Sequence, residues 1–279
     1  MTPGTRTSLA IWSALVIAFL WLPLVIIALY AFNGSTLQGW PISHWTLHWF
    51  SVAWHSDAQG AFVLSLKVGA VTTVIALVLG TLAAAAVARY RFFGREAVSF
   101  LLVLPLALPG IITGMALNSF FTFAGISVSM WTIVIGHATF CVVVVYNNVV
   151  ARLRRASHSL VEASQDLGAD GWQTFRFVLW PVLSTALVAG GLLAFALSFD
   201  EVIVTTFTAG LQQTLPLFIL DNIKQGQQLP VINVVAFFVI VVTVVPVALA
   251  QRVMRDTGII RRGAAQVTEA VEAAEIPAV

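Results

Sequence analysis

The chain contains six runs of apolar residues, each close to the length that a helix needs to cross a lipid bilayer. Such a helix needs roughly 20 mostly apolar residues, because the hydrocarbon core is about 30 Å thick and each helical residue rises about 1.5 Å. Only 9% of the 279 residues are charged, whereas soluble domains carry about a quarter. These features predict an all-α polytopic membrane protein with six spans, near 9–32, 62–88, 98–123, 131–150, 182–207 and 233–251.

The positions of the basic residues predict the orientation of the chain. Of the 14 Lys and Arg residues, all except Lys67 and Lys224 fall on one side of a six-span arrangement. Basic residues near span ends mark the cytoplasmic side, so both termini should be cytoplasmic. The pI near 9.0 then reflects topology and does not indicate nucleic-acid binding. Residues 1–8 are predicted to form a cytoplasmic tail, and residues 9–255 a six-helix domain that contains a cytoplasmic loop at 152–181. Residues 256–279 are predicted to form a flexible cytoplasmic tail.

The cytoplasmic loop has the pattern of two short amphipathic helices joined by a glycine. Ser159 and Glu162 have the spacing of a capping box, in which each side chain satisfies a free amide of the first helical turn. Gly168 is the usual left-handed stop of a helix, and Asp170 with Gln173 can cap a second helix. The loop is therefore predicted to present a surface to another protein.

Backbone-breaking residues and one amide occur within the predicted spans. Pro105, Pro109 and Gly110 interrupt the third span, and Asn118 follows on the same span. Freed carbonyls at membrane depth are tolerated where they are buried in protein or line a cavity, so these residues either line a pathway or only kink a packing helix. Pro181 is expected to interrupt the chain just before the fifth span.

Two adjacent carboxylates, Asp200 and Glu201, continue the apolar run of the fifth span. Eighteen residues from Val182 onward rise about 27 Å, which places the pair in the outer leaflet or at the outer interface. One interpretation is an interfacial pair neutralised by Lys67 or Lys224. The other is an attractive site for a cationic solute, because ionisable residues within spans mark functional sites by default.

The fourth span and the loop before the second span carry further polar residues. A polar side chain in a span faces the bundle interior, so His137 is expected to make a structural interhelical hydrogen bond. Three histidines lie in the loop, but only Asp57 could support them as metal ligands, and interfacial packing is their expected role. No metal-binding residue is predicted.

Several enzymatic mechanisms lack their motifs in this sequence. It contains no phosphate-binding loop, no His-Glu-x-x-His and no Gly-x-Ser-x-Gly, and no catalytic residue is predicted. A membrane enzyme would need a clustered constellation that is not apparent. The residues by themselves indicate a transport protein or channel with a cytoplasmic docking element. A self-sufficient secondary transporter stays open as an alternative at this point.

The loop also resembles a known motif. The stretch Glu162-Ala163-Ser164-Gln165-Asp166-Leu167-Gly168, with Trp180-Pro181 further on, resembles the EAA loop of ABC-importer permeases. That pattern is Glu-Ala-Ala, a glycine four residues on, and a later Ile-x-Leu-Pro. Here Ser164 replaces the second alanine and Trp180 the usual leucine, both mild departures.

The resemblance extends over roughly residues 20–252 and is closest to the second permease subunit of spermidine/putrescine-type importers, which have a type I, MetI-like architecture. It rests on five further strings: 104–111 (Leu-Pro-Leu-Ala-Leu-Pro-Gly-Ile), 136–140 (Gly-His-Ala-Thr-Phe), 166–169 (Asp-Leu-Gly-Ala), 197–201 (Leu-Ser-Phe-Asp-Glu) and 214–217 (Thr-Leu-Pro-Leu).

The resemblance implies a function and a set of partners. The chain would form part of the pathway for a small solute, with a polyamine favoured over an amino-acid-like solute, an anion or a metal chelate. Its partners in a bacterial inner membrane would be a second permease, an extracytoplasmic binding protein and two cytoplasmic ATPase subunits, which would use ATP and Mg²⁺. A coupling helix within about 160–171 would contact one ATPase. The implied coupling residues are Glu162, Ala163, Ser164, Asp166, Leu167, Gly168, Ala169 and Pro181; the candidate pathway residues are Asp200, Glu201, Pro109, Gly110 and Asn118.

Overall fold

The structure is a computed structural model that describes residues 3–90, 92–155, 158–226 and 228–243. In these ranges the chain is helical, apart from turns, loops and one β-bridge between Asn33 and Trp45. It divides into two units, residues 55–225 and residues 1–54 together with 226–279. The flexible tail predicted at 256–279 and the end of the predicted sixth span lie outside the described residues.

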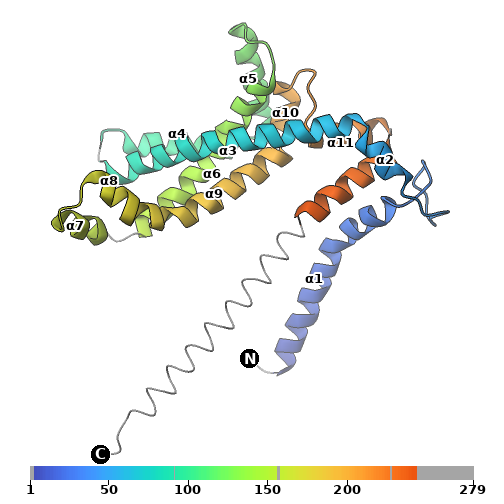
Figure 1. Cartoon of the computed structure of the whole chain (residues 1–279), viewed down its shortest axis with the longest axis horizontal. Helices are drawn as coiled ribbons and strands as arrows, with labels where there is room; N and C mark the ends of the chain where they lie inside the picture. The colour runs from blue at the N-terminus through green and yellow to red at the C-terminus, as the bar shows by residue number, and fades with distance from the viewer. Residues whose placement is uncertain (1–2, 91, 156–157, 227, 244–279) are drawn as a thin grey trace, which may run out of the picture. The chain divides into compact units, whose positions relative to one another are not determined.

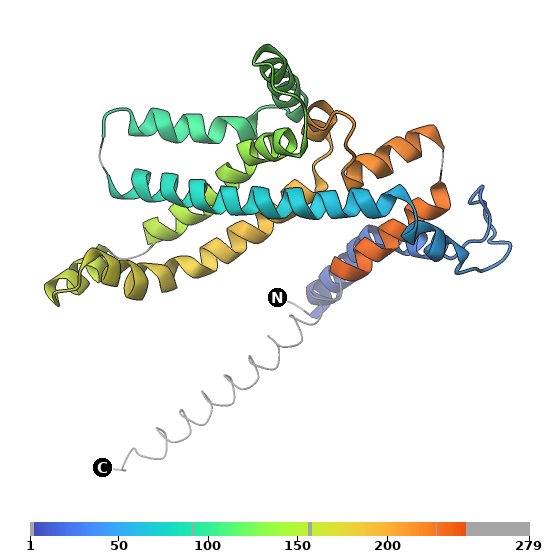
Figure 2. The ribbon, with the colours of Figure 1, turned by 45° about the horizontal axis from the view of Figure 1, so that its top comes forward.

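Three long helices form the centre of the unit 55–225, namely α3 (Asp57–Arg89), α6 (Met130–Arg155) and α9 (Trp180–Asp200). They lie side by side (Figure 1, Figure 2). A Cβ atom on Gly80 of α3 would lie 2.8 Å from the carbonyl oxygen of Val142 on α6, and Ala84 is fully buried one turn further on. The small residues of α3 therefore allow the close approach of α6.

The predicted third span is not one straight helix. It consists of α4 (Arg95–Ala107) and α5 (Gly110–Phe123), which meet at an angle of 104°. Leu108 is extended, with ψ of 140°, as expected for a residue before proline. Pro109 then caps α5. The bend follows because proline has no amide hydrogen with which to continue the ladder of α4.

The predicted fifth span differs from the structure at both ends. At its start the helix is continuous from α8 (Gly171–Thr174) through a π-helical turn, η1 (Phe175–Leu179), into α9, so Pro181 does not interrupt it. The amide of Trp180 bonds the carbonyl of Phe175 in the wider π turn, which accommodates the proline that follows. At its other end α9 stops at Asp200, and a separate short helix, α10 (Ile203–Thr208), begins after two residues.

The other unit contains α1 (Pro3–Tyr30), α2 (His48–Trp54) and an apolar helix, Leu229–Thr243. Helix α1 begins at Pro3, so most of the predicted N-terminal tail is helical. The small core of this unit combines Ala31, which directly follows α1, with Ala53 of α2 and Val231 of the apolar helix. Four helices in the described ranges are long and apolar enough to cross a membrane, and the bent pair α4–α5 can supply one more. The all-α polytopic fold is thus confirmed.

Candidate functional site

Residues 158–179, here named the α7–η1 segment, contain the predicted cytoplasmic surface. Helix α7 (His158–Asp166) is followed by a turn at Gly168, whose φ is +80°. The amide of Gly168 donates to the carbonyl of Gln165 at 2.9 Å, and the amide of Ala169 donates to the carbonyl of Ser164 at 3.0 Å. This pair of hydrogen bonds is the Schellman arrangement. The predicted glycine stop is confirmed.

The two predicted capping boxes have different outcomes. Asp170 accepts from the amide of Gln173 at 2.7 Å, and the Gln173 side chain accepts from the amide of Asp170 at 2.9 Å. The second box is therefore confirmed. Helix α7 is already helical at His158, so Ser159 lies inside the first turn and not at its cap. The helix also begins two residues before the expected coupling range of 160–171.

A buried pair of hydroxyl groups joins the two short helices. Ser164 donates to the carbonyl of Val161 at 2.8 Å, and its oxygen lies 3.0 Å from the hydroxyl oxygen of Thr174 on α8. Since a serine hydroxyl has one proton, Thr174 is the donor in this contact. Ser164 departs from the alanine of the EAA pattern, and here it links α7 to α8.

The remaining residues of the pattern lie on the surface of the unit. The Leu167 side chain is 89% exposed, and Glu162, Ala163, Asp166 and Gly168 are also exposed. In the described ranges, the main packing partners of α7 are α8 and η1. Pro181 lies apart from this surface, in the first turn of α9. An apolar and acidic face is thus left for contact with another molecule.

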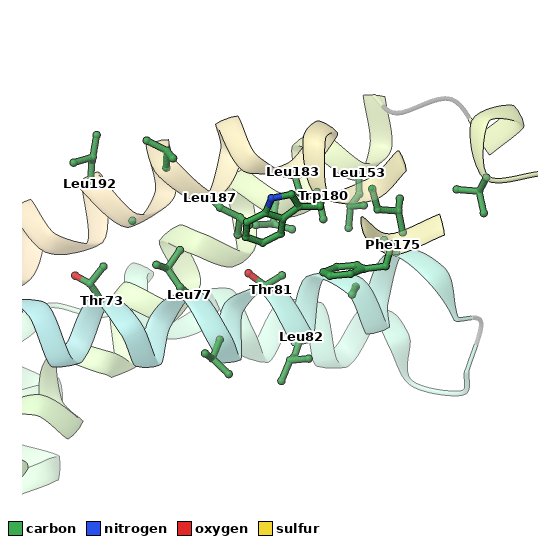
Figure 3. A pocket seen from close by; sticks show the side chains of 18 of the residues that line it. Thr73, Leu77, Thr81, Leu82, Leu153, Phe175, Trp180, Leu183, Leu187 and Leu192 are labelled. Atoms are coloured by element: carbon green, nitrogen blue, oxygen red, sulfur yellow. The ribbon is translucent and has the colours of Figure 1, made fainter. Parts of the chain in front are cut away.

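An apolar groove of about 990 Å³ runs between α3 and α9 and reaches this segment. Figure 3 shows Thr73, Leu77 and Leu82 of α3 on one side and Trp180, Leu187 and Leu192 of α9 on the other. Glu162 and Gln165 of α7 line one end of the groove. Thr81, also in the lining, has a buried hydroxyl without a hydrogen-bond partner among the described residues.

The second candidate site is the α9–α10 junction, defined here as residues 198–205. Glu201 accepts two hydrogen bonds in this junction. Its carboxylate accepts from the amide of Val204 at 2.9 Å, and its backbone carbonyl accepts from the Thr205 hydroxyl at 2.7 Å. Asp200 is exposed. Within the described ranges its carboxylate has no hydrogen-bond or ion-pair partner, and neither carboxylate pairs with Lys67 or Lys224. The ion pair with Lys67 or Lys224, one of the two interpretations of these carboxylates, is therefore not formed in the described ranges.

Helix α10 brings the candidate residues of the third span to the junction. A Cβ on Gly110 would lie 3.6 Å from Ile203, and one on Gly114 would lie 2.6 Å from Phe207. The Asn118 amide donates to the carbonyl of Phe207 at 2.6 Å. Asn118 thus anchors α10 to α5. Pro109, at the bend before Gly110, positions α5 for these contacts.

His137 makes the interhelical hydrogen bonds that were expected of it. It is fully buried, and its Nδ1 lies 2.8 Å from the hydroxyl of Ser198 on α9, while its Nε2 lies 2.8 Å from the hydroxyl of Thr205 on α10. Sequence reasoning did not identify Ser198 or Thr205. The only signal was a hydroxyl residue on either side of the Asp200–Glu201 pair.

Comparison with known proteins adds three findings. The profile of the family described as "Binding-protein-dependent transport system inner membrane component" matches residues 76–256. The chain is 32% identical to the spermidine/putrescine transport system permease protein PotC of Haemophilus influenzae over 243 residues, which cover 86% of this chain and 93% of that protein. It is 33% identical to the putrescine transport system permease protein PotI of Escherichia coli over 232 residues, or 80% and 82% of the two chains.

Among solved structures, a chain of a bacterial ABC transporter involved in the import of the acidic polysaccharide alginate matches with a TM-score of 0.63 at 16% sequence identity. The match covers 90% of this chain and 98% of that one. At this identity the likeness supports the fold alone. The matched family range contains both the α7–η1 segment and the α9–α10 junction.

Proposed function

The chain belongs to the family of binding-protein-dependent transport system inner membrane components and is a permease subunit of an ABC importer; on this basis we propose that its solute is a polyamine of the spermidine or putrescine type. The named activities of the relatives PotC and PotI support this solute. The observation that carries it within this chain is the exposed carboxylate of Asp200, which has no partner in the described ranges.

The charge of a polyamine fits this carboxylate. Alkyl ammonium groups such as that of lysine have pKa values near 10.4, so the amines of a polyamine are cationic at neutral pH. A pair of opposite charges 4 Å apart attracts by about 4 kcal/mol at the effective dielectric constant of ~20 near a protein surface. Asp200 can therefore hold one ammonium group. Glu201 contributes to the field, but its carboxylate is already bonded to the amide of Val204.

The groove between α3 and α9 is not the place for a polyamine. Its lining is mostly leucine, valine, alanine and aromatic side chains. A cation moved from water into such surroundings without a counter-charge pays a large desolvation cost. Glu162 and Gln165 lie only at its cytoplasmic end. The solute pathway is better supported beside the α9–α10 junction.

The proposed complex has a second permease subunit, two cytoplasmic ATPase subunits that bind ATP and Mg²⁺, and an extracytoplasmic binding protein. This chain binds no cofactor in the proposal, and ATP hydrolysis belongs to the partners. Both termini and the α7–η1 segment lie in the cytoplasm of a bacterial cell, because the basic residues gather on that side. The exposed face around Leu167 contacts one ATPase.

The geometry offers a direct route for coupling between the two candidate sites. The helix Gly171–Asp200 has 30 residues without a break, a rise of about 45 Å. It starts beside the surface proposed for the ATPase and ends at Asp200. Movement of the α7–η1 segment when the ATPases close on ATP would therefore reach the junction through one rigid element. Such a switch shifts between two states according to the bound ligand.

The test is uptake of radiolabelled spermidine by the complete transporter in liposomes. Asp200→Asn should raise the KM about tenfold, equivalent to ~1.4 kcal/mol, with normal assembly. Glu201→Gln is the matched control, because its side-chain oxygen can still accept from the amide of Val204, and it should change the KM by less than about threefold.

Three outcomes would contradict the proposal. Unchanged spermidine uptake in a correctly assembled Asp200→Asn transporter would show that this carboxylate does not contact the solute. Failure of the wild-type transporter to import polyamines, with uptake of another small solute, would overturn the polyamine assignment. Uptake without any ATPase subunit would favour a secondary transporter instead.

A further inference from the structure

A chain of four polar groups connects three helices at the α9–α10 junction. It contains the hydroxyl of Ser198 on α9, the imidazole of His137 on α6, the hydroxyl of Thr205 on α10 and the backbone carbonyl of Glu201 between α9 and α10. The three heavy-atom distances are 2.8, 2.8 and 2.7 Å. His137, Ser198 and Thr205 are all buried. We name these four groups the His137 relay.

The donors in this relay can be assigned by counting protons. Thr205 has one hydroxyl proton and donates it to the carbonyl of Glu201, so its oxygen must accept from Nε2–H of His137. A fully buried imidazolium without an acidic partner would be costly, and the ring is therefore neutral. Its Nδ1 is then an acceptor, and Ser198 donates to it. All three hydrogen bonds run in one direction, from α9 through α6 to the junction.

The His137 relay lies at the break between α9 and α10. Helix α9 ends at Asp200 and α10 begins at Ile203, so the residues between them are not held by a continuous ladder. Thr205 fixes the carbonyl of Glu201, and the amide of Val204 fixes its carboxylate. His137 in turn holds both sides of the break, through Ser198 before it and Thr205 after it.

A close helix contact makes this reach possible. A Cβ on Gly136 would lie 2.9 Å from the Val204 side chain, so any larger residue at 136 would push α10 away from α6. The residue next to it, His137, therefore reaches Thr205 at hydrogen-bond distance. The preceding turn of α6 adds a second contact, because the Thr132 hydroxyl lies 2.8 Å from the carbonyl of Thr208 and shares its one proton between that carbonyl and the carbonyl of Ser129, 2.7 Å away.

We propose that His137 is a positioning residue for solute recognition: through Ser198 and Thr205 it fixes the junction so that the Asp200 carboxylate is held exposed at one place. His137 itself contacts no solute. The role rests on the proposed function in one respect, namely that Asp200 contacts the solute. The hydrogen bonds of His137 to Ser198 and Thr205, on the two sides of the helix break, do not depend on the identity of the solute.

The first experiment measures the junction without any solute. Hydrogen exchange of the assembled transporter in nanodiscs is followed for peptides that cover residues 196–208. Thr205→Val removes the hydroxyl with little change of shape and should speed exchange of these amides about tenfold, since it leaves the Nε2–H of His137 and the Glu201 carbonyl unsatisfied. Thr205→Ser keeps the hydroxyl and should restore slow exchange.

Thr206→Val is the matched control for this measurement. Thr206 lies on the same helix and its hydroxyl makes the same kind of bond, to the carbonyl of Val202 at 2.8 Å. It is exposed and takes no part in the relay. Exchange in this variant should stay at the wild-type rate. Equal exchange in Thr205→Val and Thr206→Val would overturn the tie across the break.

The second experiment tests the link to Asp200 by a double-mutant cycle on spermidine uptake. Thr205→Val should raise the KM about fivefold with little change in maximal rate, and Thr205→Ser should rescue it. Combined with Asp200→Asn, the two effects should be less than multiplicative, because both act through one carboxylate. Fully multiplicative effects, or an unchanged KM in Thr205→Val, would overturn the positioning role. If Asp200→Asn alone has no effect on the KM, the proposed contact between Asp200 and the solute is wrong. The hydrogen-exchange result would still show whether His137 holds the two sides of the helix break together.

Discussion

The α7–η1 segment and the α9–α10 junction hold their polar groups in opposite ways. In the segment, the Ser164–Thr174 pair joins side chains only ten residues apart. In the junction they lie far apart in sequence, 61 residues for His137 with Ser198 and 68 for His137 with Thr205. The first region is locally self-sufficient and leaves its outer face for another protein. The second takes its shape from the rest of the bundle.

This difference suggests how each region responds to substitution. A locally capped segment should tolerate changes elsewhere in the chain but not a change to its own turn. A junction held by distant helices should respond to substitutions on any of those helices. The two regions are joined by the unbroken helix Gly171–Asp200. Substitutions in the segment can therefore affect transport while the junction stays intact.

The largest effect is expected from Gly168→Pro. Gly168 has a φ of +80° and donates its amide to Gln165, whereas proline fixes φ near −65° and has no amide hydrogen. The turn between α7 and α8 cannot form with proline there. Transport should fall at least about tenfold, and ATPase stimulation by the loaded binding protein should be lost, with the complex still inserted in the membrane.

Gly171→Pro is its matched control. Gly171 occupies the first position of α8 after the cap Asp170, where proline is well tolerated. Asp170 is already extended, with ψ of 173°, as a residue before proline requires. Near-normal transport in Gly171→Pro, alongside loss in Gly168→Pro, would support the assignment. Wild-type transport in Gly168→Pro would contradict the coupling role of the segment.

A smaller effect is expected from Leu167→Asp, which changes the exposed face and not the fold. The side chain is 89% exposed, so the free energy of unfolding should change by less than about 0.5 kcal/mol. A carboxylate at an apolar contact is unfavourable, and binding of the ATPase should weaken about tenfold. Leu167→Met keeps the apolar character and should bind normally. Equal ATPase binding by both variants in a pull-down titration would place the contact elsewhere.

The same contrast explains how much of the candidate sites could be predicted from sequence. Gly168, Asp170 and Gln173 were identified correctly, because capping depends on residues three or four positions apart. Asp200 and Glu201 were recognised as unusual, but the difference in their hydrogen bonding was not. The two residues differ because the Glu201 carboxylate accepts from an amide in the first turn of α10. No sequence pattern predicted α10, a helix of six residues.

The fold class could be predicted from the sequence, but the positions where helices bend or stop could be predicted less well. Hydropathy located the long helices because their apolar length is set by the bilayer. The two prolines had opposite effects. Pro109 ends one helix and starts another at 104°, whereas Pro181 is accommodated by the π turn of η1. The difference lies in the backbone before each proline, which is extended at Leu108 and a π turn before Pro181, and hydropathy does not predict it.

The smallest effect is expected at the Ser164–Thr174 pair, which tests whether the segment is locally self-sufficient. Ser164→Ala leaves the buried Thr174 hydroxyl without its acceptor, at a cost of about 1 kcal/mol in local stability. Thr174→Val should cost less, because Ser164 still donates to the carbonyl of Val161. The double variant should return close to wild type, since removing both partners leaves no buried group unsatisfied.

Hydrogen exchange of residues 160–176 in the assembled transporter measures these differences. If the pair acts locally, exchange speeds about fivefold in Ser164→Ala, recovers in the double variant, and stays unchanged at residues 196–208 in all three. Additive effects of the two substitutions would mean that the hydroxyls do not act as a pair. Faster exchange at 196–208 would mean that the segment and the junction share one cooperative unit through the helix Gly171–Asp200, so that local capping alone does not stabilise the segment.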